Sequence, residues 1–378
     1  MILRVPDYYE DFACVAGACT GSCCEGWEID IDDATREYYC QVKDTIGERL
    51  REKLYQGEDG EYRFHLGHLG QKDRCPFLNE NNLCDIYAAL GEEALSEVCT
   101  DFPRFSLSYG HVMQRILSVS CEEVGRIIFE HQNPVSYVEY EMDGCVEDWE
   151  DEEADEAYIA FLEKFQFHCI DLLQNRSLSL KERVGRFLAL CEKAQEVINQ
   201  YALDSDAARL EQAWEKMDGL SLDTSFRTED FDVEAKDGLL WEAFELRWSI
   251  LDELEEIGQE WVDVKHGVMQ TLTEDTYVSL RRNYLESEAY QPLCYEQLLV
   301  YFTFRYLMQA VYSWDIQAYG KMIISFTLMV RDLDLYRFAS QNGVLSMKDR
   351  IRMAYVFSRE VEHSEENFEQ IREELMFE

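Results

Sequence analysis

The sequence is poor in proline, in basic residues and in long apolar runs. Of its 378 residues, 5 are proline and 35 are lysine or arginine, against 77 aspartate or glutamate, which gives a net charge of −42. A surface of that sign repels phosphate, so we expect neither nucleic acid nor an anionic membrane as a partner. No run approaches the roughly 18 apolar residues that span a bilayer, and no basic, then apolar, leader opens the chain. We therefore expect a cytoplasmic protein.

The scarce prolines mark a division of the chain. Four of the five, and nine of the 13 cysteines, precede residue 135, whereas the sequence from about residue 157 onward spaces its apolar residues three and four apart. Between them, residues 147–156 carry eight carboxylates, which favours a solvated linker. The sequence predicts a mostly α protein with a cysteine-rich metal-binding domain with short strands over 1–146, an acidic linker over 147–156 and an α-helical domain over 157–378.

Local patterns predict several elements of the first domain. A helix is expected over 34–54 with Asp33 as its cap, a short strand over 61–67, and a hairpin-like loop over 75–87 that turns at Asn81 and Asn82. A further helix is expected over 118–131, with Ser120 as the candidate cap.

In the second domain, residues 294–314 are apolar on several faces and predict a central buried helix. Its aromatic residues favour a bundle core, and a pocket for methyllysine or a methyl donor is the less favoured alternative. These residues are Tyr295, Tyr301, Phe302, Phe304 and Tyr306.

The cysteines carry the strongest functional signal. Their spacing is C-x4-C-x3-C-C, then a pair eight residues apart, then two single residues; they are Cys14, Cys19, Cys23, Cys24, Cys75, Cys84, Cys99 and Cys121. In a reducing compartment, clustered thiols are metal ligands or catalytic groups rather than disulfides. We expect Gly17 and Gly21 to supply positive-φ turns that wrap the first loop around an ion. The isolated Cys40, Cys145, Cys169, Cys191 and Cys294 are expected to be small buried hydrophobes.

Three interpretations of these eight cysteines remain open. Structural zinc sites normally use C-x2-C pairs, and the sequence has none, so an iron–sulfur cluster is favoured over zinc and over inert buried thiols. One cluster needs at most four of them, and spacing does not choose which. The adjacent Cys23 and Cys24 tend to diverge, so one of the two is expected to be a spectator.

Several of these segments resemble the flagellin lysine-N-methylase family. The resemblance rests on Cys14–Cys24 with the trailing GWEIDID, on CPFL with Cys84-x-Ile-Tyr, on Cys99-x2-Phe-Pro-Arg, on SVSCEEV and on the stretch 281–306. The opening spacing is wider than the C-x2-C-x2-C-C motif of the larger cysteine-cluster group, so the likeness is to the methylase branch.

The resemblance implies methylation of lysine ε-amino groups on flagellin or another lysine-rich protein, with S-adenosylmethionine as donor and a [4Fe–4S] cluster held among the eight cysteines. The acidic surface would attract such a substrate. No G-x-G-x-x-G turn follows an apolar strand, so donor binding needs another device, for which an open iron position is one possibility. The alternative from another class is a non-enzymatic metal-binding or redox-sensing module with iron–sulfur or zinc.

Overall fold

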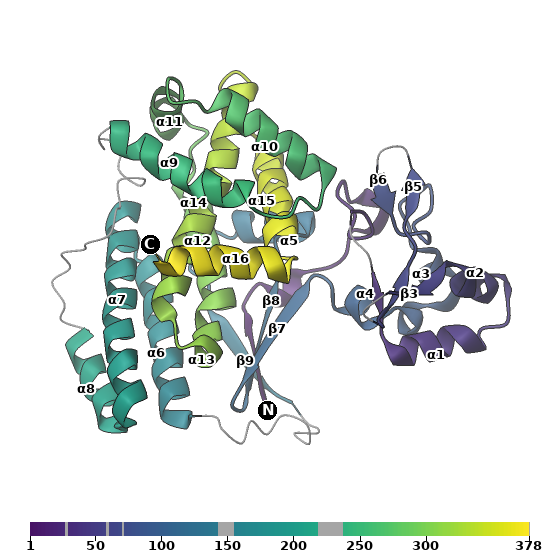
Figure 1. The fold of residues 1–378 in the computed structure, drawn as a ribbon, viewed down its shortest axis with the longest axis horizontal. Helices are drawn as coiled ribbons and strands as arrows, with labels where there is room; N and C mark the ends of the chain where they lie inside the picture. Colours follow the sequence, from purple (N-terminus) through teal and green to yellow (C-terminus); the bar gives the residue numbers. More distant parts are fainter. Residues whose placement is uncertain (27–28, 58–59, 70–71, 143–154, 218–236, 378) are drawn as a thin grey trace.

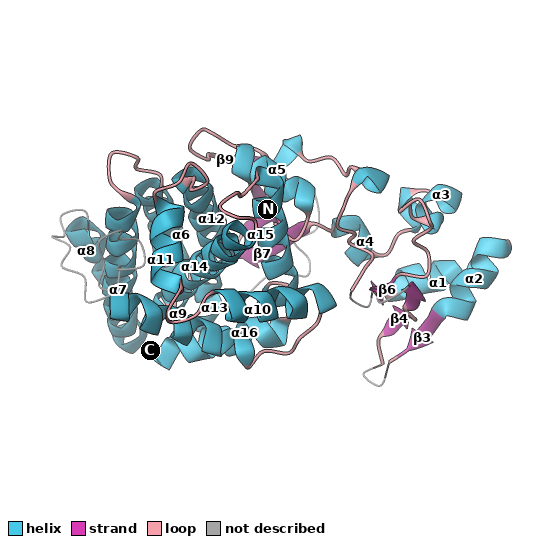
Figure 2. Ribbon diagram, turned by 90° about the horizontal axis from the view of Figure 1, so that it is seen from above, coloured by secondary structure: helices cyan, strands magenta, loops and turns pink. Residues whose placement is uncertain are grey.

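The computed structural model describes residues 1–377 except 27–28, 58–59, 70–71, 143–154 and 218–236. It has two lobes of unequal size, side by side in both views (Figures 1 and 2). Each lobe is built on its own hydrophobic core. Residues 147–154 of the predicted linker lie outside the described residues. Its last two residues, Asp155 and Glu156, are the N-cap and the first residue of helix α6.

The large lobe contains a four-stranded sheet in the order β7-β8-β1-β9. Its strands are β1 (Ile2–Pro6), β7 (Arg104–Tyr109), β8 (Val112–Leu117) and β9 (Tyr137–Glu141). β7 and β8 form an antiparallel hairpin, β8 and β1 are parallel, and β1 and β9 are antiparallel. The hairpin turns at Gly110, whose φ of +50° suits glycine.

Twelve helices complete the large lobe in the described residues. They are α5 (Glu122–Glu130), α6 (Glu156–Leu173), α7 (Leu180–Asp204), α8 (Ala207–Met217), α9 (Asp237–Asp252), α10 (Gln259–Thr271), α11 (Tyr277–Leu285), α12 (Pro292–Tyr306), α13 (Ala310–Ser313), α14 (Ile316–Ser340), α15 (Met347–Val361) and α16 (Glu365–Phe377). α14 is the central helix and packs on α7, α10, α12, α15 and α16. Among the described helices, none is long and apolar enough to cross a membrane.

The large core joins residues from both sides of the predicted linker. Val112, Leu117 and Val124 are buried together with apolar residues of helices α6 to α16. The expectation of a mostly helical protein is confirmed, and so is the buried helix predicted over 294–314. That helix is α12, buried from Cys294 to its end, after which the chain tightens into a 3-10 turn at Leu307–Gln309.

The small lobe combines short helices with two small sheets. Its elements are β2 (Asp30–Ile31), α1 (Asp33–Gln41), α2 (Thr45–Lys53), β3 (Leu54–Gln56), β4 (Tyr62–Phe64), β5 (Gly67–Leu69), β6 (Lys72–Arg74), α3 (Asp85–Leu90) and α4 (Glu97–Asp101). β2, β4 and β3 form an antiparallel sheet, and β5 pairs with β6. Tyr39, Leu50, Phe64 and Phe77 are at the centre of its core.

The structure differs from the sequence prediction in the caps of two helices and in the number of helices over 34–54. The cap of α1 is Asp32, whose carboxylate accepts from Thr35 N at 2.8 Å, so the prediction of Asp33 was wrong by one residue. The helix predicted over 34–54 is two helices, because the chain is extended at Val42 and a second cap, Asp44, starts α2. The N-cap of α5 is Cys121 rather than Ser120. The short strand expected over 61–67 is present over Tyr62–Phe64 only, as β4. The turn expected at Asn81 and Asn82 is confirmed, because Asn82 N donates to Asn79 O at 3.0 Å.

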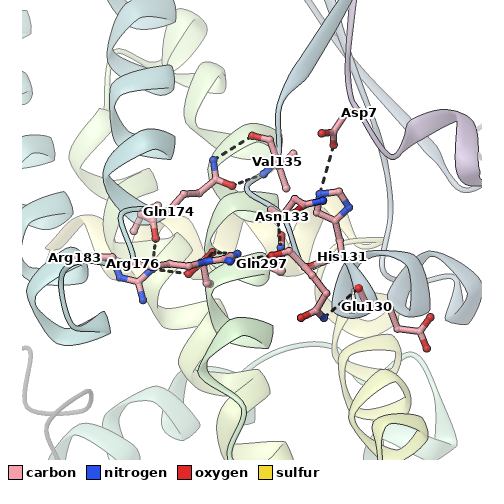
Figure 3. Close-up of polar contacts among 12 residues, drawn as sticks. Asp7, Glu130, His131, Asn133, Val135, Gln174, Arg176, Arg183 and Gln297 are labelled. Carbon is pink, nitrogen blue, oxygen red and sulfur yellow. Dashed lines mark hydrogen bonds and ion pairs between the residues drawn. The ribbon is translucent and has the colours of Figure 1, made fainter.

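Side chains of the helical bundle fix the connection between α5 and β9 (Figure 3). Gln174 accepts from Val135 N at 2.5 Å and donates to Val135 O at 3.1 Å, as a strand neighbour would. Gln297 donates to His131 O at 2.8 Å. These bonds satisfy backbone groups that lie in neither a helix nor a strand. They also attach the segment before β9 to the helical bundle.

Candidate functional site

The cysteine-rich segment before β2 is one of two crossings between the lobes. The chain leaves the large lobe after the 3-10 turn Tyr9–Asp11 and enters the small lobe at β2; it returns between α4 and β7 (Figure 2). Because residues 14–26 lie between two separately packed bodies, groups from both lobes determine their conformation.

On the large-lobe side, a carboxylate at the start of α5 holds the loop. Glu122 accepts from Thr20 N at 3.2 Å, from Thr20 Oγ1 at 2.5 Å and from Gly21 N at 3.0 Å. Arg352 of α15 donates to the same carboxylate at 2.8 Å. Burial alone would raise the pKa of Glu122, but the bonds from Thr20 and Arg352 lower it, so this carboxylate stays ionised at neutral pH.

Two turns further along α15, Arg359 binds the backbone on both sides of the adjacent cysteines. Its guanidinium donates to Ser22 O at 2.7 Å and to Glu25 O, and also to Tyr355 Oη at 2.6 Å. Gly21 packs so closely on α15 that a Cβ there would lie 2.6 Å from Cζ of Tyr355. The loop is thereby fitted to one face of α15.

The small lobe binds the other side of the loop. Cys75 N donates to Cys24 O at 2.7 Å. A Cβ at Gly17 would lie 2.9 Å from Asn81 O, in the turn between Cys75 and Cys84.

The expectation that Gly17 and Gly21 adopt positive φ was wrong. In this loop the positive values belong to Ala16, at 49°, and Gly26, at 86°. Gly17 and Gly21 are required by close approach of neighbouring groups rather than by backbone conformation.

Five of the eight cysteines are close enough to influence one another's pKa, and we call them the thiol cluster: Cys23, Cys24, Cys75, Cys84 and Cys99. Cys23 and Cys24 lie in the loop, and Cys75 begins the hairpin-like turn. Cys84 is the N-cap of α3, and Cys99 lies in α4. Cys24, Cys84 and Cys99 pack on the small core, to which Cys75 belongs. The Sγ atoms of the two adjacent cysteines are 3.8 Å apart.

Electrostatics in the thiol cluster disfavours free thiolates at most positions. Burial raises the pKa of Cys75 to about 12, and the nearby Cys99 and Cys84 raise it as well. Burial raises the pKa of Cys99 to about 11, again with contributions from Cys23 and Cys84. Cys23 differs, because a hydrogen bond from Cys24 and the charge of Arg359 lower its pKa to about 7. One exposed thiol with a lowered pKa thus lies beside several thiols whose pKa is raised.

The other three predicted ligands flank the thiol cluster on the large-lobe side. Cys14 and Cys19 precede it in the loop, and Cys121 is the N-cap of α5. Burial raises the pKa of Cys121 to about 12, with contributions from Cys19 and Cys23. Cys23 therefore links the thiol cluster to these flanking thiols, and the eight cysteines extend from the core of the small lobe to the start of α5 in the large lobe.

The donor set suits a thiolate-bound metal centre in kind and number. All described cysteines are free of disulfides, and bringing several thiols together at raised pKa is unfavourable for thiolates unless a cation compensates. Within the described ranges, however, no three His, Cys, Asp or Glu side chains are already arranged as a metal site. The ligand set among the eight cysteines therefore stays a prediction.

Of the isolated cysteines, Cys169, Cys191 and Cys294 are buried, as predicted, and Cys40 is exposed, against prediction. Cys145 lies outside the described residues. Sequence reasoning missed Arg352 and Arg359, which recur with Tyr355 at helical spacing on one face of α15.

Comparison with known proteins identifies the family of the helical half of the chain. Residues 166–378 match the family model described as the FliB lysine N-methylase C-terminal domain. A lysine-N-methylase of Salmonella choleraesuis (strain SC-B67) is 34% identical over 125 residues, which are 32% of this chain and 30% of that protein. The flagellar biosynthetic protein FliU of Salmonella muenchen is 33% identical over 125 residues, 32% of this chain and 72% of that protein. The chain thus matches under a third of the length of the lysine-N-methylase. No solved structure matches.

Proposed function

We propose that this chain, which belongs to the FliB lysine N-methylase family, is a protein-lysine N-methyltransferase that acts on flagellin with S-adenosylmethionine as methyl donor. The observation that carries the proposal is the match of the helical half to this family together with the gathering of its cysteines between the lobes. The net charge of −42 adds support, because it steers a lysine-bearing protein toward the surface. We place the reaction in the cytoplasm, where thiols stay reduced.

We further propose a resident [4Fe–4S] cluster. Cys24, Cys75, Cys84 and Cys99 would hold it, because they share one small core; Cys23 would lie at its edge. Such a cluster supplies a redox-active group or an open iron position. Glu122 and Arg359 hold the loop in place. Backbone N–H groups would stabilise sulfur charge, because Ala16 N donates to Cys14 Sγ at 3.4 Å and Tyr87 N donates to Cys84 Sγ at 3.5 Å.

In the proposed reaction, the lysine ammonium first loses a proton. The nitrogen lone pair then forms the N–C bond to the methyl group as the S–C bond breaks, and S-adenosylhomocysteine leaves. A carboxylate near the site would accept the proton or hold the ammonium before transfer.

The test is to incubate anaerobically purified protein with S-adenosylmethionine and flagellin and to follow the mass of lysine-containing peptides. We expect methyl additions that depend on the donor. Replacing Cys24, Cys75 or Cys99 by serine should slow the transfer at least about tenfold, because ligand loss removes the centre. Cys40→Ser is the matched control, since Cys40 is exposed on α1, and its rate should equal that of the unaltered protein.

Protein that contains its metal but methylates no lysine would contradict the proposal. That result would favour the alternative, a metal-binding or redox-sensing module in which the helical lobe binds a partner.

A further inference from the structure

A second feature of the large lobe lies next to the cysteine loop. It is a cleft of about 330 Å³ between the β7–β8 hairpin and helices α12 and α16, within the size range of small-molecule sites. Three phenylalanines form its apolar walls: Phe105, Phe304 and Phe368. Its polar lining includes Arg305, Tyr306, Glu362 and His363.

A buried cation forms part of this lining. Arg305 is 8% exposed, and its guanidinium lies 3.9 Å from the centroid of the Phe105 ring. Its guanidinium donates to Tyr301 Oη at 3.0 Å. The distance from this guanidinium to the Glu362 carboxylate is 3.5 Å, which is longer than in a bidentate arginine–carboxylate pair. Five donors with so few close acceptors suit a further anionic group.

The neighbouring Tyr306 supplies an unused donor. Its side chain is 3% exposed. The Arg305 guanidinium lies beside its hydroxyl as a donor, but no described group accepts the hydroxyl proton. A buried hydroxyl proton without an acceptor is costly, and a ligand that accepts from it would remove that cost.

The lining also offers an acceptor. Glu362 Oε2 accepts from Tyr301 Oη at 2.8 Å and from Ser358 Oγ at 2.9 Å, whereas Oε1 has only a long contact of 3.5 Å to Tyr301. Glu362 Oε1 therefore has capacity to accept from an ammonium group.

The cleft is coupled to the cysteine loop through the end of α15. His363 Nε2 lies 2.6 Å from Ser120 Oγ, next to Cys121, and Arg359 binds the loop one turn earlier. Burial, with the charges of Arg305 and Arg359, lowers the pKa of His363 to about 3, so the imidazole is neutral at pH 7.

We propose that this cleft binds the α-amino-acid end of S-adenosylmethionine, with the carboxylate on Arg305 and Tyr306 and the ammonium on Glu362. This rests on the proposed function for the identity of the ligand. A lysine side chain alone fits less well, because the buried Arg305 would repel its ammonium group, whereas a zwitterion satisfies both signs of charge. A free amino acid such as methionine shares this head-group chemistry, so both are probes.

The decisive variant is Tyr306→Phe, which removes the hydroxyl that has no internal acceptor and leaves Arg305 in place. We expect its melting temperature to change little and its affinity for S-adenosylhomocysteine, measured calorimetrically, to fall about tenfold, because a hydrogen bond to a charged group is lost. Methionine should bind more weakly but with the same dependence on the hydroxyl. Tyr201→Phe is the matched control, since that hydroxyl donates to Asp155 on another face, and it should leave both affinities unchanged.

Three results would overturn the assignment: unchanged affinity in Tyr306→Phe, binding of adenosine but not of methionine, or loss of S-adenosylhomocysteine binding when metal is removed from folded protein. The last result would place the donor on iron instead. Unaltered methylation of flagellin in any of these cases would leave the proposed function standing. Binding of methionine by a protein that methylates nothing would uphold the cleft as an amino-acid site and reject the function.

Discussion

Replacing Asp334 by alanine is expected to lower the free energy of unfolding by about 3–5 kcal/mol, because it leaves a buried arginine without its counter-ion. Asp334 and Arg350 are 0% and 2% exposed, and their carboxylate and guanidinium are 2.9 Å apart. Tyr295 donates to the same carboxylate at 2.6 Å. The measurement is chemical denaturation followed by circular dichroism, with the unaltered protein beside the variant.

Two variants show whether charge burial is the cause. Glu130→Ala breaks an exposed pair with Arg126 on α5 and should cost at most about 1 kcal/mol. Combining Asp334→Ala with Arg350→Met should recover much of the loss, because no unpaired charge remains. A double variant as unstable as Asp334→Ala alone would show that the loss comes from packing.

Replacing Arg359 by methionine should release the cysteine loop from α15. Its charge-assisted bonds to Ser22 O and Glu25 O contribute about 1.5–3 kcal/mol each. We expect iron to be lost and, in metal-free protein, alkylation of Cys23 at pH 7 to slow several-fold, since Arg359 helps to lower the pKa of that thiol. Iron content and mass spectrometry of the alkylated peptide measure the two effects.

Two controls accompany this change. Arg359→Lys keeps the positive charge, so alkylation of Cys23 should slow little. Iron should still be lost, because a lysine ammonium cannot bind both Ser22 O and Glu25 O. Arg126→Met removes an arginine from the exposed face of α5 and should alter neither property. Retention of all iron in Arg359→Met would contradict the role assigned to α15.

Local signals in the sequence predicted much of this protein. Helical periodicity identified the bundle and the buried α12, and Asn82, with φ of 55°, marks the turn expected between Cys75 and Cys84. Residues 104–109 alternate polar and apolar side chains and end at Tyr-Gly, which is a signal for a strand followed by a tight turn.

The remaining features depend on contacts between distant segments. The parallel pairing of β1 with β8 joins residue 2 to residue 112, and no local pattern encodes it. Arg352 and Arg359 have the pattern of a solvated helix face until the cysteine loop is placed against them. The cleft was not predicted either, because in the sequence Phe304 and Tyr306 have the pattern of core aromatics in α12. They line a cleft because the β7–β8 hairpin lies opposite them.

Binding of an iron–sulfur centre by the thiol cluster can be measured on anaerobically purified protein. We expect a brown protein with iron and acid-labile sulfide in equal amounts, and loss of colour in Cys24→Ser, Cys75→Ser and Cys99→Ser but not in Cys40→Ser. Colourless protein that contains zinc, or no metal at all, would contradict this expectation.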